Sequence, residues 1–252
     1  MSANLHRTPS HPLSPVPLAE FRVGVDNVIF SVDTQQNRLL VLVIMRHEAP
    51  FAGYWSLPGT LVRQGESLED AAYRVLAEKI RVNTLYLEQL YTFGGPQGDR
   101  QCDPCESPQP PTPRYLSVSH FALVRFADAE LIADGASGLA WYPLAQVPQL
   151  AFDHNEILAY GYRRLRNKLE YSPIAFDVLP EVFTLGDLYQ LYVTVLGEGF
   201  SDYSNFRARL LKLGFLRDTG RKTSRGAGRP ASLYRFDAAA FEPCQEKPMV
   251  FI

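Results

Sequence analysis

The first half of the chain alternates between strand-like and helix-like patterns of apolar positions. Two segments, 21–32 and 38–46, are rich in β-branched and apolar residues and are separated by the polar stretch DTQQN, which predicts two strands joined by a turn. Further strands are predicted at 85–93 and 115–126, and a short strand with a turn is predicted at 139–148. The pattern therefore indicates a sheet.

Two helices are predicted among these strands. Apolar residues recur at helical spacing over 68–80, and Ser67 with Asp70 resembles a capping box at the start of this segment. The stretch DHNEILAYGYRRLRNKL predicts the second helix, with Asp153 as its cap and Glu156 completing the box. Strands and helices in this order indicate the α/β fold class.

The pattern changes after about residue 172. Residues 184–196 and 201–216 predict two capped amphipathic helices, the second ending at Gly214, and two short strands then flank the basic tip RKTSRGAGRPA. Helix, helix, strand, basic loop and strand is the order of a winged helix-turn-helix. The predicted organisation is a disordered arm at 1–18, an α/β domain at 19–172 with a long exposed loop at 94–114, a linker at 173–180 and a winged-helix domain at 181–252.

Composition narrows the function classes. An apolar content of 46% in 252 residues supports two cores, and the three cysteines cannot form the disulfide framework of a secreted protein. No apolar run approaches the length of a membrane span, and the start of the chain lacks a hydrophobic signal core. We therefore expect a cytoplasmic protein with no membrane partner. Cys102 and Cys105 have the spacing of half a zinc site, but no second pair accompanies them, and His120 is expected to be a core histidine.

Positive charge is concentrated in the second domain. Between Asp202 and Phe236 there are nine Lys or Arg against two acids, so this segment carries +7 and the rest of the chain carries −9 of the total −2. Such an asymmetry is typical of a nucleic-acid-binding module on an acidic carrier. The alternative is that the charges form only a solvated face.

The helix at 201–216 can present a polar stripe to DNA. Steps of 100° from Phe206 place Leu210 and Leu213 on the apolar side and the polar residues opposite. The stripe and its flanks offer side chains for base edges and phosphates, and the basic tip can follow the backbone. RNA is an alternative ligand, although no aromatic residues are interleaved with the charges. The predicted DNA-binding residues are Ser204, Asn205, Arg207, Ala208, Arg209, Lys212, Arg221, Lys222, Arg225 and Arg229.

Residues 58–82, PGTLVRQGESLEDAAYRVLAEKIRV, resemble the Nudix box, and the likeness extends over about residues 20–170. The spacing of the box is kept, whereas its content is not. Glu66, Arg74, Leu76, Glu78 and Val82 match the usual form, and the four departures are Thr60, Val75, Lys79 and Arg81. The resemblance implies a Nudix α/β/α sandwich followed by the winged helix-turn-helix domain.

The departures remove the carboxylates on which Nudix chemistry depends. Hydrolysis of a diphosphate link needs divalent cations, and Mg²⁺ requires several oxygen ligands. Positions 75, 78 and 79 would share one helix face, where this chain has Val, Glu and Lys. The ammonium of Lys79 would repel a metal ion, so we expect neither metal binding nor catalysis. The alternative is that Val75 is simply a core residue and Lys79 a solvated surface lysine.

The pocket can remain after the metal is lost. Arginines can hold a diphosphate or a sugar, and aromatic rings can stack on a base. For each aromatic, a packed core residue is an equally good interpretation. The predicted effector-binding residues are Arg46, Phe51, Trp55, Glu66, Arg74, Glu78, Tyr91 and Arg114.

The two halves together resemble the Nudix-related transcriptional regulators, the NrtR family. The segments NFRARLLKLGFL, GRPASLYRF and AFDH match that pattern. Membership implies a bacterial homodimeric repressor of NAD-metabolism genes, which binds double-stranded palindromic operator DNA and releases it when the Nudix domain binds ADP-ribose or a related nucleotide. Some relatives respond to sugars instead, so NAD, ATP and sugars stay open as effectors; no cofactor is implied.

Two other classes of function compete with a regulator. In the first, Glu66, Glu69, Asp70 and Glu78 still gather Mg²⁺, and the protein hydrolyses ADP-ribose slowly with an accessory nucleic-acid-binding domain. In the second, the winged helix docks a protein partner, and the chain is an interaction scaffold. Turnover with excess Mg²⁺ distinguishes the first class, and absence of duplex binding at low salt distinguishes the second.

Overall fold

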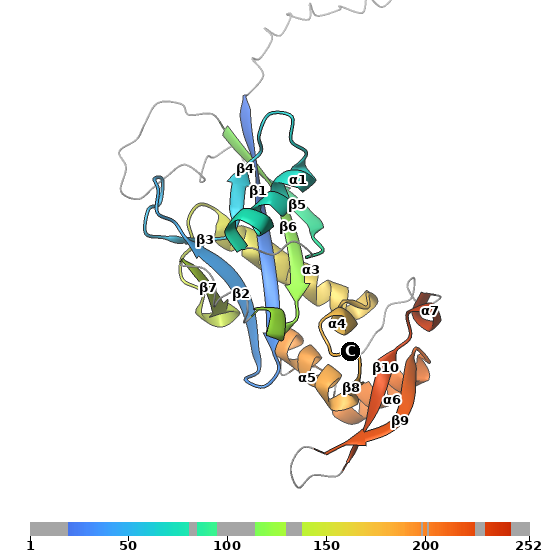
Figure 1. The fold of residues 1–252 in the computed structure, drawn as a ribbon. Helices are drawn as coiled ribbons and strands as arrows, with labels where there is room; N and C mark the ends of the chain where they lie inside the picture. The colour runs from blue at the N-terminus through green and yellow to red at the C-terminus, as the bar shows by residue number, and fades with distance from the viewer. Residues whose placement is uncertain are drawn as a thin grey trace, which may run out of the picture.

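The computed structural model describes residues 20–80, 85–94, 114–129, 138–197, 199–200, 202–224 and 230–242 (Figure 1). The predicted arm at 1–18, the cysteines of the loop 94–114, and the predicted DNA contacts Arg225 and Arg229 lie outside these residues. Within the described ranges, no helix is long and apolar enough to cross a membrane.

A seven-stranded mixed sheet forms the centre of the first domain. Its longest strand, β1, runs parallel to β6 and antiparallel to β2 and β4. The strand order is β3-β2-β1-β6-β5, with β7 paired to β2. The strands are β1 (Phe21–Asp33), β2 (Arg38–Met45), β3 (Trp55–Ser56), β4 (Gly59–Leu61), β5 (Glu88–Phe93), β6 (Arg114–Val124) and β7 (Leu139–Pro143), and a 3-10 turn, η2 (Leu144–Gln146), follows β7.

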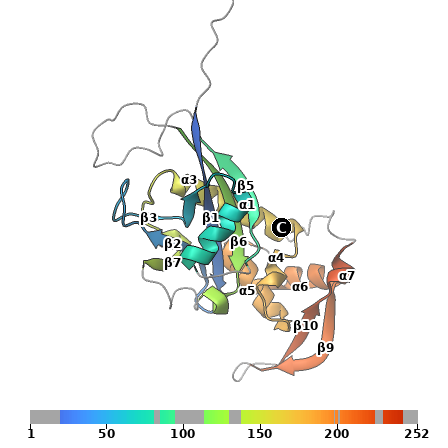
Figure 2. The same cartoon turned by 45° about the horizontal axis from the view of Figure 1, so that its top comes forward.

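Alternation along β1 supplies two cores, one on each face of the sheet. Val25 and Ile29 face α1 (Leu68–Val75) and the turn that follows it, and Val28 faces α3 (His154–Tyr171). In both views, α1 and α3 lie on opposite sides of β1 (Figure 1, Figure 2). The predicted α/β/α sandwich is confirmed.

Gly161 allows close packing of α3 on the sheet. A Cβ at Gly161 would lie 3.1 to 3.4 Å from three side-chain atoms of Val28, which is tighter than ordinary van der Waals contact. On the other face, His120 in β6 is buried, and burial lowers the pKa of its imidazole. The expectation of a core histidine is confirmed for its burial, although its Nδ1 has no hydrogen-bond partner among the described residues.

The helix predicted over 68–80 changes its winding within the Nudix-like box. Ser67 caps α1 by accepting a hydrogen bond from the Asp70 backbone N–H, as predicted. From Leu76 to Ile80, however, the chain forms a π-helix, η1, which spaces its hydrogen bonds one residue wider than an α-helix. The expectation that positions 75, 78 and 79 share one α-helical face was therefore wrong: Val75 is buried, and the other two residues are exposed.

Two further local expectations differ from the structure. Asp153 occupies the N-cap of α3 but makes no side-chain capping hydrogen bond. Its φ of −90° and ψ of 19° depart from the extended backbone that lets a cap side chain reach the first turn. The predicted strand at 85–93 is shorter than expected, because β5 begins at Glu88.

The second domain is a winged helix-turn-helix, as predicted. Thr184 and Asp187 form a capping box at the start of the first helix, and Gly214, with φ of 79°, follows the second. A three-stranded sheet in the order β8-β10-β9 completes the domain. The elements are β8 (Phe183–Thr184), α5 (Leu185–Leu196), α6 (Tyr203–Lys212), β9 (Leu216–Thr223), β10 (Ala231–Phe236) and α7 (Ala238–Phe241).

The segment predicted as a linker, 173–180, is folded. It contains the short helix α4 (Ile174–Asp177), whose Phe176 stacks on Phe236 of β10 with ring centroids 4.3 Å apart. Phe176 also contacts Phe183 and Phe215. Long-range aromatic contacts therefore bring the segment into the core of the winged domain, although the prolines at its two ends resemble those of a linker.

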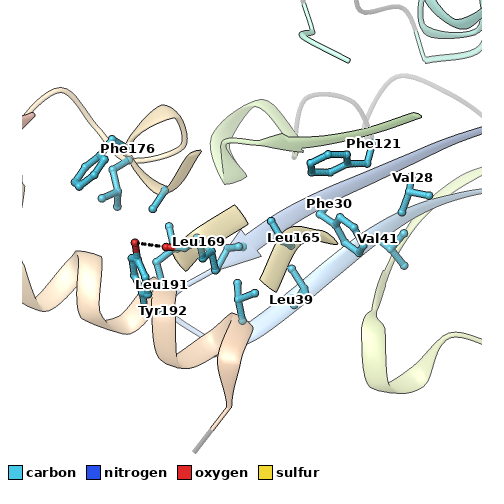
Figure 3. Close-up of a cluster of buried hydrophobic side chains, with 14 of the residues drawn as sticks. Val28, Phe30, Leu39, Val41, Phe121, Leu165, Leu169, Phe176, Leu191 and Tyr192 are labelled. Carbon is cyan, nitrogen blue, oxygen red and sulfur yellow. Dashed lines mark hydrogen bonds between the residues drawn. The ribbon is translucent and has the colours of Figure 1, made fainter. Parts of the chain in front are cut away.

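The two domains share one apolar core (Figure 3). It runs from Val28 and Phe30 in the sheet, through Leu165 and Leu169 of α3, to Leu191 of α5 and onward to the residues around Phe206. Continuous burial of this kind stabilises the contact through the hydrophobic effect. The domains are therefore packed together rather than joined by chain alone.

Two tyrosines connect α3 and α5 in a reciprocal manner. Tyr192 of α5 donates to the carbonyl oxygen of Leu169 at 2.9 Å, and Tyr162 of α3 donates to the carbonyl oxygen of Val195 at 2.9 Å. Both carbonyls lie in the last turn of a helix, where intrahelical donors run out. For Leu169, the residue four positions on is Pro173, which has no N–H. Each helix therefore supplies a donor that the other lacks.

We predict that Tyr192→Phe lowers the free energy of unfolding by about 1–2 kcal/mol, because it leaves a buried carbonyl without its donor. Tyr162→Phe is the matched control, since its hydroxyl is only partly buried and water can replace it, and we expect a smaller loss. Urea unfolding of the full chain measures both. Equal losses in the two variants would contradict the role of the buried bond.

Candidate functional site

Arg74 organises the Nudix-like segment. Its guanidinium donates to both carboxylate oxygens of Glu66, at 2.6 and 2.9 Å, and to the carbonyl oxygen of Leu61 at 3.0 Å. It also lies 3.5 Å from a carboxylate oxygen of Glu78. The hydrogen bond from Arg74, together with one from the Arg63 backbone, lowers the pKa of Glu66 to about 2. Glu66 is therefore an ion-paired carboxylate at neutral pH.

The remaining carboxylates do not fit the Mg²⁺ that Nudix hydrolases use. Glu78 is half exposed and lies between two guanidinium groups, 3.6 Å from Arg63 and 3.5 Å from Arg74. Val75 is buried in the core, and Lys79 brings a positive charge. Mg²⁺ needs a near-octahedral set of oxygens. Among the residues that the structure describes, no three His, Cys, Asp or Glu side chains are grouped to hold a metal ion.

Lys79 contacts the sheet at Gly59, the first residue of β4, where β4 pairs with β1. Its ammonium donates to the carbonyl oxygen of Gly59 at 2.6 Å. Gly59 pairs with Asp26, and a Cβ there would lie 2.0 Å from a carboxylate oxygen of that residue, so the position requires glycine. Burial and then the charge of Arg46 lower the pKa of Lys79, while the Asp26 and Glu78 charges oppose this shift.

A buried polar network lies behind this point. Nδ1 of His154 accepts a hydrogen bond from the Leu57 backbone N–H at 2.9 Å, and its Nε2 lies 3.5 Å from an oxygen of Asp26. The hydroxyl of Ser117 donates to the other oxygen of Asp26. An accepting Nδ1 leaves the ring proton on Nε2, facing the carboxylate. The network fixes the start of α3 against β1. AFDH, noted as a family pattern, marked His154 in the sequence, but no pattern marked Asp26.

Arg46 lies at the end of β2 in an aromatic setting. Its Nε donates to the Pro50 carbonyl oxygen at 2.9 Å, and its guanidinium carbon lies 4.8 Å from the centre of the Phe152 ring. Phe51, which has a φ of 65°, packs on the same ring at 4.8 Å. Burial lowers the pKa of Arg46. Trp55 contacts the Tyr142 ring edge-on. The carbonyl oxygen of Trp55 accepts a hydrogen bond from the backbone N–H of Ala151, the neighbour of Phe152.

The structure separates the predicted effector-binding residues into groups. Arg46 and Phe51 form one group, and Glu66, Arg74 and Glu78 form a second. Charges from both groups act on the pKa of Lys79: Arg46 of the first, and Glu78 and Arg74 of the second. Two predicted residues lie elsewhere. Tyr91 stacks on Tyr160 of α3 with centroids 5.0 Å apart, and Arg114 lies over the Phe21 ring and donates to the Gly94 carbonyl oxygen. The sequence pattern marked Lys79 only as a lost carboxylate, whereas the structure places it between the groups.

A separate depression of about 240 Å³ lies on α3, lined by Tyr160, Arg163, Arg164, Arg166 and Asn167. It is on the helix that covers the opposite face of the sheet from α1. Arg164 in this depression is already paired with Glu88 at 3.2 Å, and Arg163 lies over the Tyr160 ring. None of the box residues lines it, so the surface around Lys79 and Arg46 is the better candidate site.

The second candidate surface is α6 with the wing strand β9. Phe206 and Leu210 of α6 are buried, as the predicted stripe requires, and Leu213 is half-buried. Asp202 caps the helix by accepting from the Ser204 and Asn205 backbone N–H groups. The predicted contacts within the described residues are all exposed: Ser204, Asn205, Arg207, Ala208, Arg209, Lys212, Arg221 and Lys222.

Ion pairing divides the cations of this domain into two classes. Arg217 pairs with Asp237, and Arg235 pairs with Glu181 at 3.0 Å. Within the described part of the domain, Arg207, Lys212, Arg221 and Lys222 have no carboxylate within ion-pair distance, and they are the cations that α6 and β9 expose. Unpaired cations of this kind are available for phosphates.

Known proteins resemble both halves. The Nudix domain family matches residues 20–164, and the AraR C-terminal winged HTH domain family matches residues 171–252. The ADPR responsive transcriptional repressor NtrR of Acinetobacter baylyi is 34% identical over 216 residues, covering 84% of this chain and 80% of the relative. An ADP-ribose pyrophosphatase of Methanocaldococcus jannaschii is 30% identical over 146 residues, covering 58% of this chain and 75% of the relative.

The crystal structure of Shewanella oneidensis NrtR complexed with a 27mer DNA is 32% identical in sequence and superposes with a TM-score of 0.71, covering 91% of this chain and 98% of that one. The likeness therefore includes both domains and their relative placement. With a Nudix domain followed by an AraR-type winged helix-turn-helix, this chain belongs to the NrtR family of Nudix-related transcriptional regulators.

Proposed function

We propose that this protein is a bacterial transcriptional repressor that binds operator DNA through α6 and the wing, and releases it when a nucleotide of the ADP-ribose class binds the Nudix domain. One observation carries the proposal: the Nudix carboxylates are held by arginines, whereas Arg207 and Lys212 of α6 have no carboxylate within ion-pair distance in the described structure. The A. baylyi relative is named an ADPR responsive repressor, and the S. oneidensis relative was crystallised with DNA, which supports both parts.

The proposed assembly is a cytoplasmic homodimer with two-fold symmetry. It would place two α6 helices in successive major grooves of a palindromic site, about 34 Å apart. Resemblance to the family favours NAD-metabolism genes as the targets. An effector releases DNA only if it binds the conformation that cannot bind DNA more tightly than it binds the DNA-binding conformation. The difference in binding free energy is typically about 1–3 kcal/mol.

Contacts between the domains are the proposed route for this coupling. Asn37, in the turn between β1 and β2, accepts hydrogen bonds from Gln190 and Thr194 of α5. The segment 170–180 contains α4 and its aromatic contacts. A shift of the sheet relative to α5 would have to break or rearrange these contacts. The same shift would move the α6 helices of a dimer relative to each other.

Residual hydrolysis is the second candidate function, because the M. jannaschii relative is named a pyrophosphatase and Glu66 and Glu78 are retained. We predict no turnover of ADP-ribose above background with excess Mg²⁺, since both carboxylates are paired with arginine. Chromatographic detection of AMP over hours measures this. Turnover that disappears in Glu78→Gln would establish catalysis and overturn the prediction.

We predict that Arg207→Ala combined with Arg209→Ala weakens binding to every duplex. Each lost phosphate contact lowers the slope of log affinity against log salt by about 0.9, so two contacts lower it by about 1.8. Arg217→Ala is the matched control, because that guanidinium is already paired with Asp237. Fluorescence anisotropy at several salt concentrations measures the slopes. An unchanged slope in the double variant would remove α6 from the interface.

We predict that Asn205→Ala instead relaxes sequence preference at particular base pairs. An asparagine amide can read adenine through two hydrogen bonds, which are worth about 1–3 kcal/mol of discrimination. Binding to a selected operator should fall about tenfold or more, while binding to random duplex stays near the wild-type value. If Asn205→Ala weakens both duplexes equally, α6 is not the recognition helix.

A further inference from the structure

Two cations beside the Nudix-like box, Arg46 and Lys79, have no carboxylate within ion-pair distance among the residues that the structure describes. Arg74 differs from them, because Glu66 and the backbone carbonyl of Leu61 occupy its guanidinium. An anion at this surface would therefore meet Arg46 and Lys79 as the cations with free capacity.

A chain of contacts connects the two cations. The guanidinium of Arg46 lies over the Phe152 ring, which packs on His154 with ring centroids 5.3 Å apart, and His154 lies 3.5 Å from Asp26. Asp26 pairs with Gly59, whose carbonyl oxygen accepts a hydrogen bond from Lys79.

Both cations are held in place by the backbone. The Lys79 ammonium uses one donor on the Gly59 carbonyl oxygen at 2.6 Å, which leaves two N–H donors. Arg46 uses Nε on the Pro50 carbonyl oxygen, with a longer contact from Nη2 to the Glu48 carbonyl oxygen at 3.4 Å, and its guanidinium rests against the Phe152 ring. A cation fixed before the ligand arrives loses less conformational entropy on binding.

Each of the two cations meets both like and opposite charges. Burial lowers the pKa of both side chains, and the positive charge of Arg46 further lowers that of Lys79. The charges of Glu48 and Asp26 oppose the shift at Arg46, and those of Asp26 and Glu78 oppose it at Lys79. Asp26 is buried and engaged by Ser117, with His154 at 3.5 Å. The unused N–H donors of Arg46 and Lys79 can therefore donate to the oxygens of an added anion.

The sequence position of Lys79 relates these two cations to the metal site of Nudix hydrolases. Lys79 stands at the sequence position where the Nudix box has a metal-binding glutamate. Lysine in place of glutamate removes a metal ligand and adds the positive charge that the metal ion would supply. Diphosphate oxygens accept strong charge-assisted hydrogen bonds from both ammonium and guanidinium groups.

We propose that Lys79 and Arg46 bind the diphosphate of the effector directly, so that effector binding requires no metal ion. Lys79 supplies the positive charge that a divalent cation supplies in hydrolases of this fold. The inference deepens the proposed function for the phosphate part of the ligand, and inorganic pyrophosphate tests it without the nucleoside.

The test is isothermal titration of the full chain with inorganic pyrophosphate and, separately, with ADP-ribose, each in EDTA and in Mg²⁺. We expect wild-type protein to bind both ligands in EDTA. Lys79→Gln should weaken both by about tenfold or more, because it removes a charged hydrogen bond. Lys79→Glu should abolish binding in EDTA. Arg125→Gln, at the end of β6 and paired only with Asp128 at 3.0 Å, removes the same charge elsewhere and should bind like wild type.

Thermal unfolding without ligand shows whether the variants are folded, and Arg46→Gln gives an independent variant on a different strand. Pyrophosphate binding that requires Mg²⁺ in wild type, or that is unchanged in Lys79→Gln and Arg46→Gln, overturns the proposed diphosphate site. If pyrophosphate binds through Lys79 but ADP-ribose does not bind, the diphosphate site is supported and the proposed effector is wrong. If ADP-ribose binds equally well to wild type and Lys79→Gln, the proposed effector is supported and the diphosphate site is wrong.

Discussion

The packing of α3 against α5 gives the two domains a common core, and the proposed regulation depends on that contact. Helix α3 contacts the sheet through Val28 and Gly161 on one side and reaches α5 through Leu165, Leu169 and the two tyrosine-to-carbonyl hydrogen bonds on the other. The start of the same helix carries His154, which is buried beside Asp26. One helix therefore touches the candidate effector site at its first turn and the DNA-binding domain at its last turns. A displacement of α3 would be felt at both ends, which is the physical requirement for coupling between two sites.

Electrostatics assign different tasks to the two domains. In the Nudix domain, Arg74 pairs with the carboxylates that remain from the box, whereas Lys79 and Arg46 have no carboxylate within ion-pair distance in the described structure. In the winged domain, Arg217 and Arg235 are paired internally, while Arg207 and Lys212 of α6 have no ion pair within the described residues. Both surfaces can donate to phosphate oxygens, the first to those of a diphosphate and the second to those of a DNA backbone. In the proposed function, loss of carboxylates converts a site for hydrolysis into a site for recognition.

The sequence was sufficient for most elements and insufficient for their contacts. Period-two and helical patterns located β1, β2, β6, α3, α5 and α6, because each segment buries one or two faces along its length. The π-helix at Leu76–Ile80 was not predictable, since its wider turn leaves the apolar spacing nearly unchanged. The network of Asp26, Ser117 and His154 joins residues about a hundred positions apart, so no local pattern contains it. The segment 173–180 looked like a linker because the partners of Phe176 lie on distant strands.

The most direct measurement is the anisotropy of a labelled duplex, selected by this chain from random sequence, bound to the full-length protein and titrated with ADP-ribose in EDTA. Reciprocal coupling without a metal requires that the duplex be released as the ligand saturates the Nudix domain. The anisotropy should fall to that of free DNA, and adenosine, which lacks the diphosphate, should leave the complex intact. A complex that persists at saturating ADP-ribose, or that dissociates only after Mg²⁺ is added, would contradict the claim that metal-free binding of the effector releases DNA.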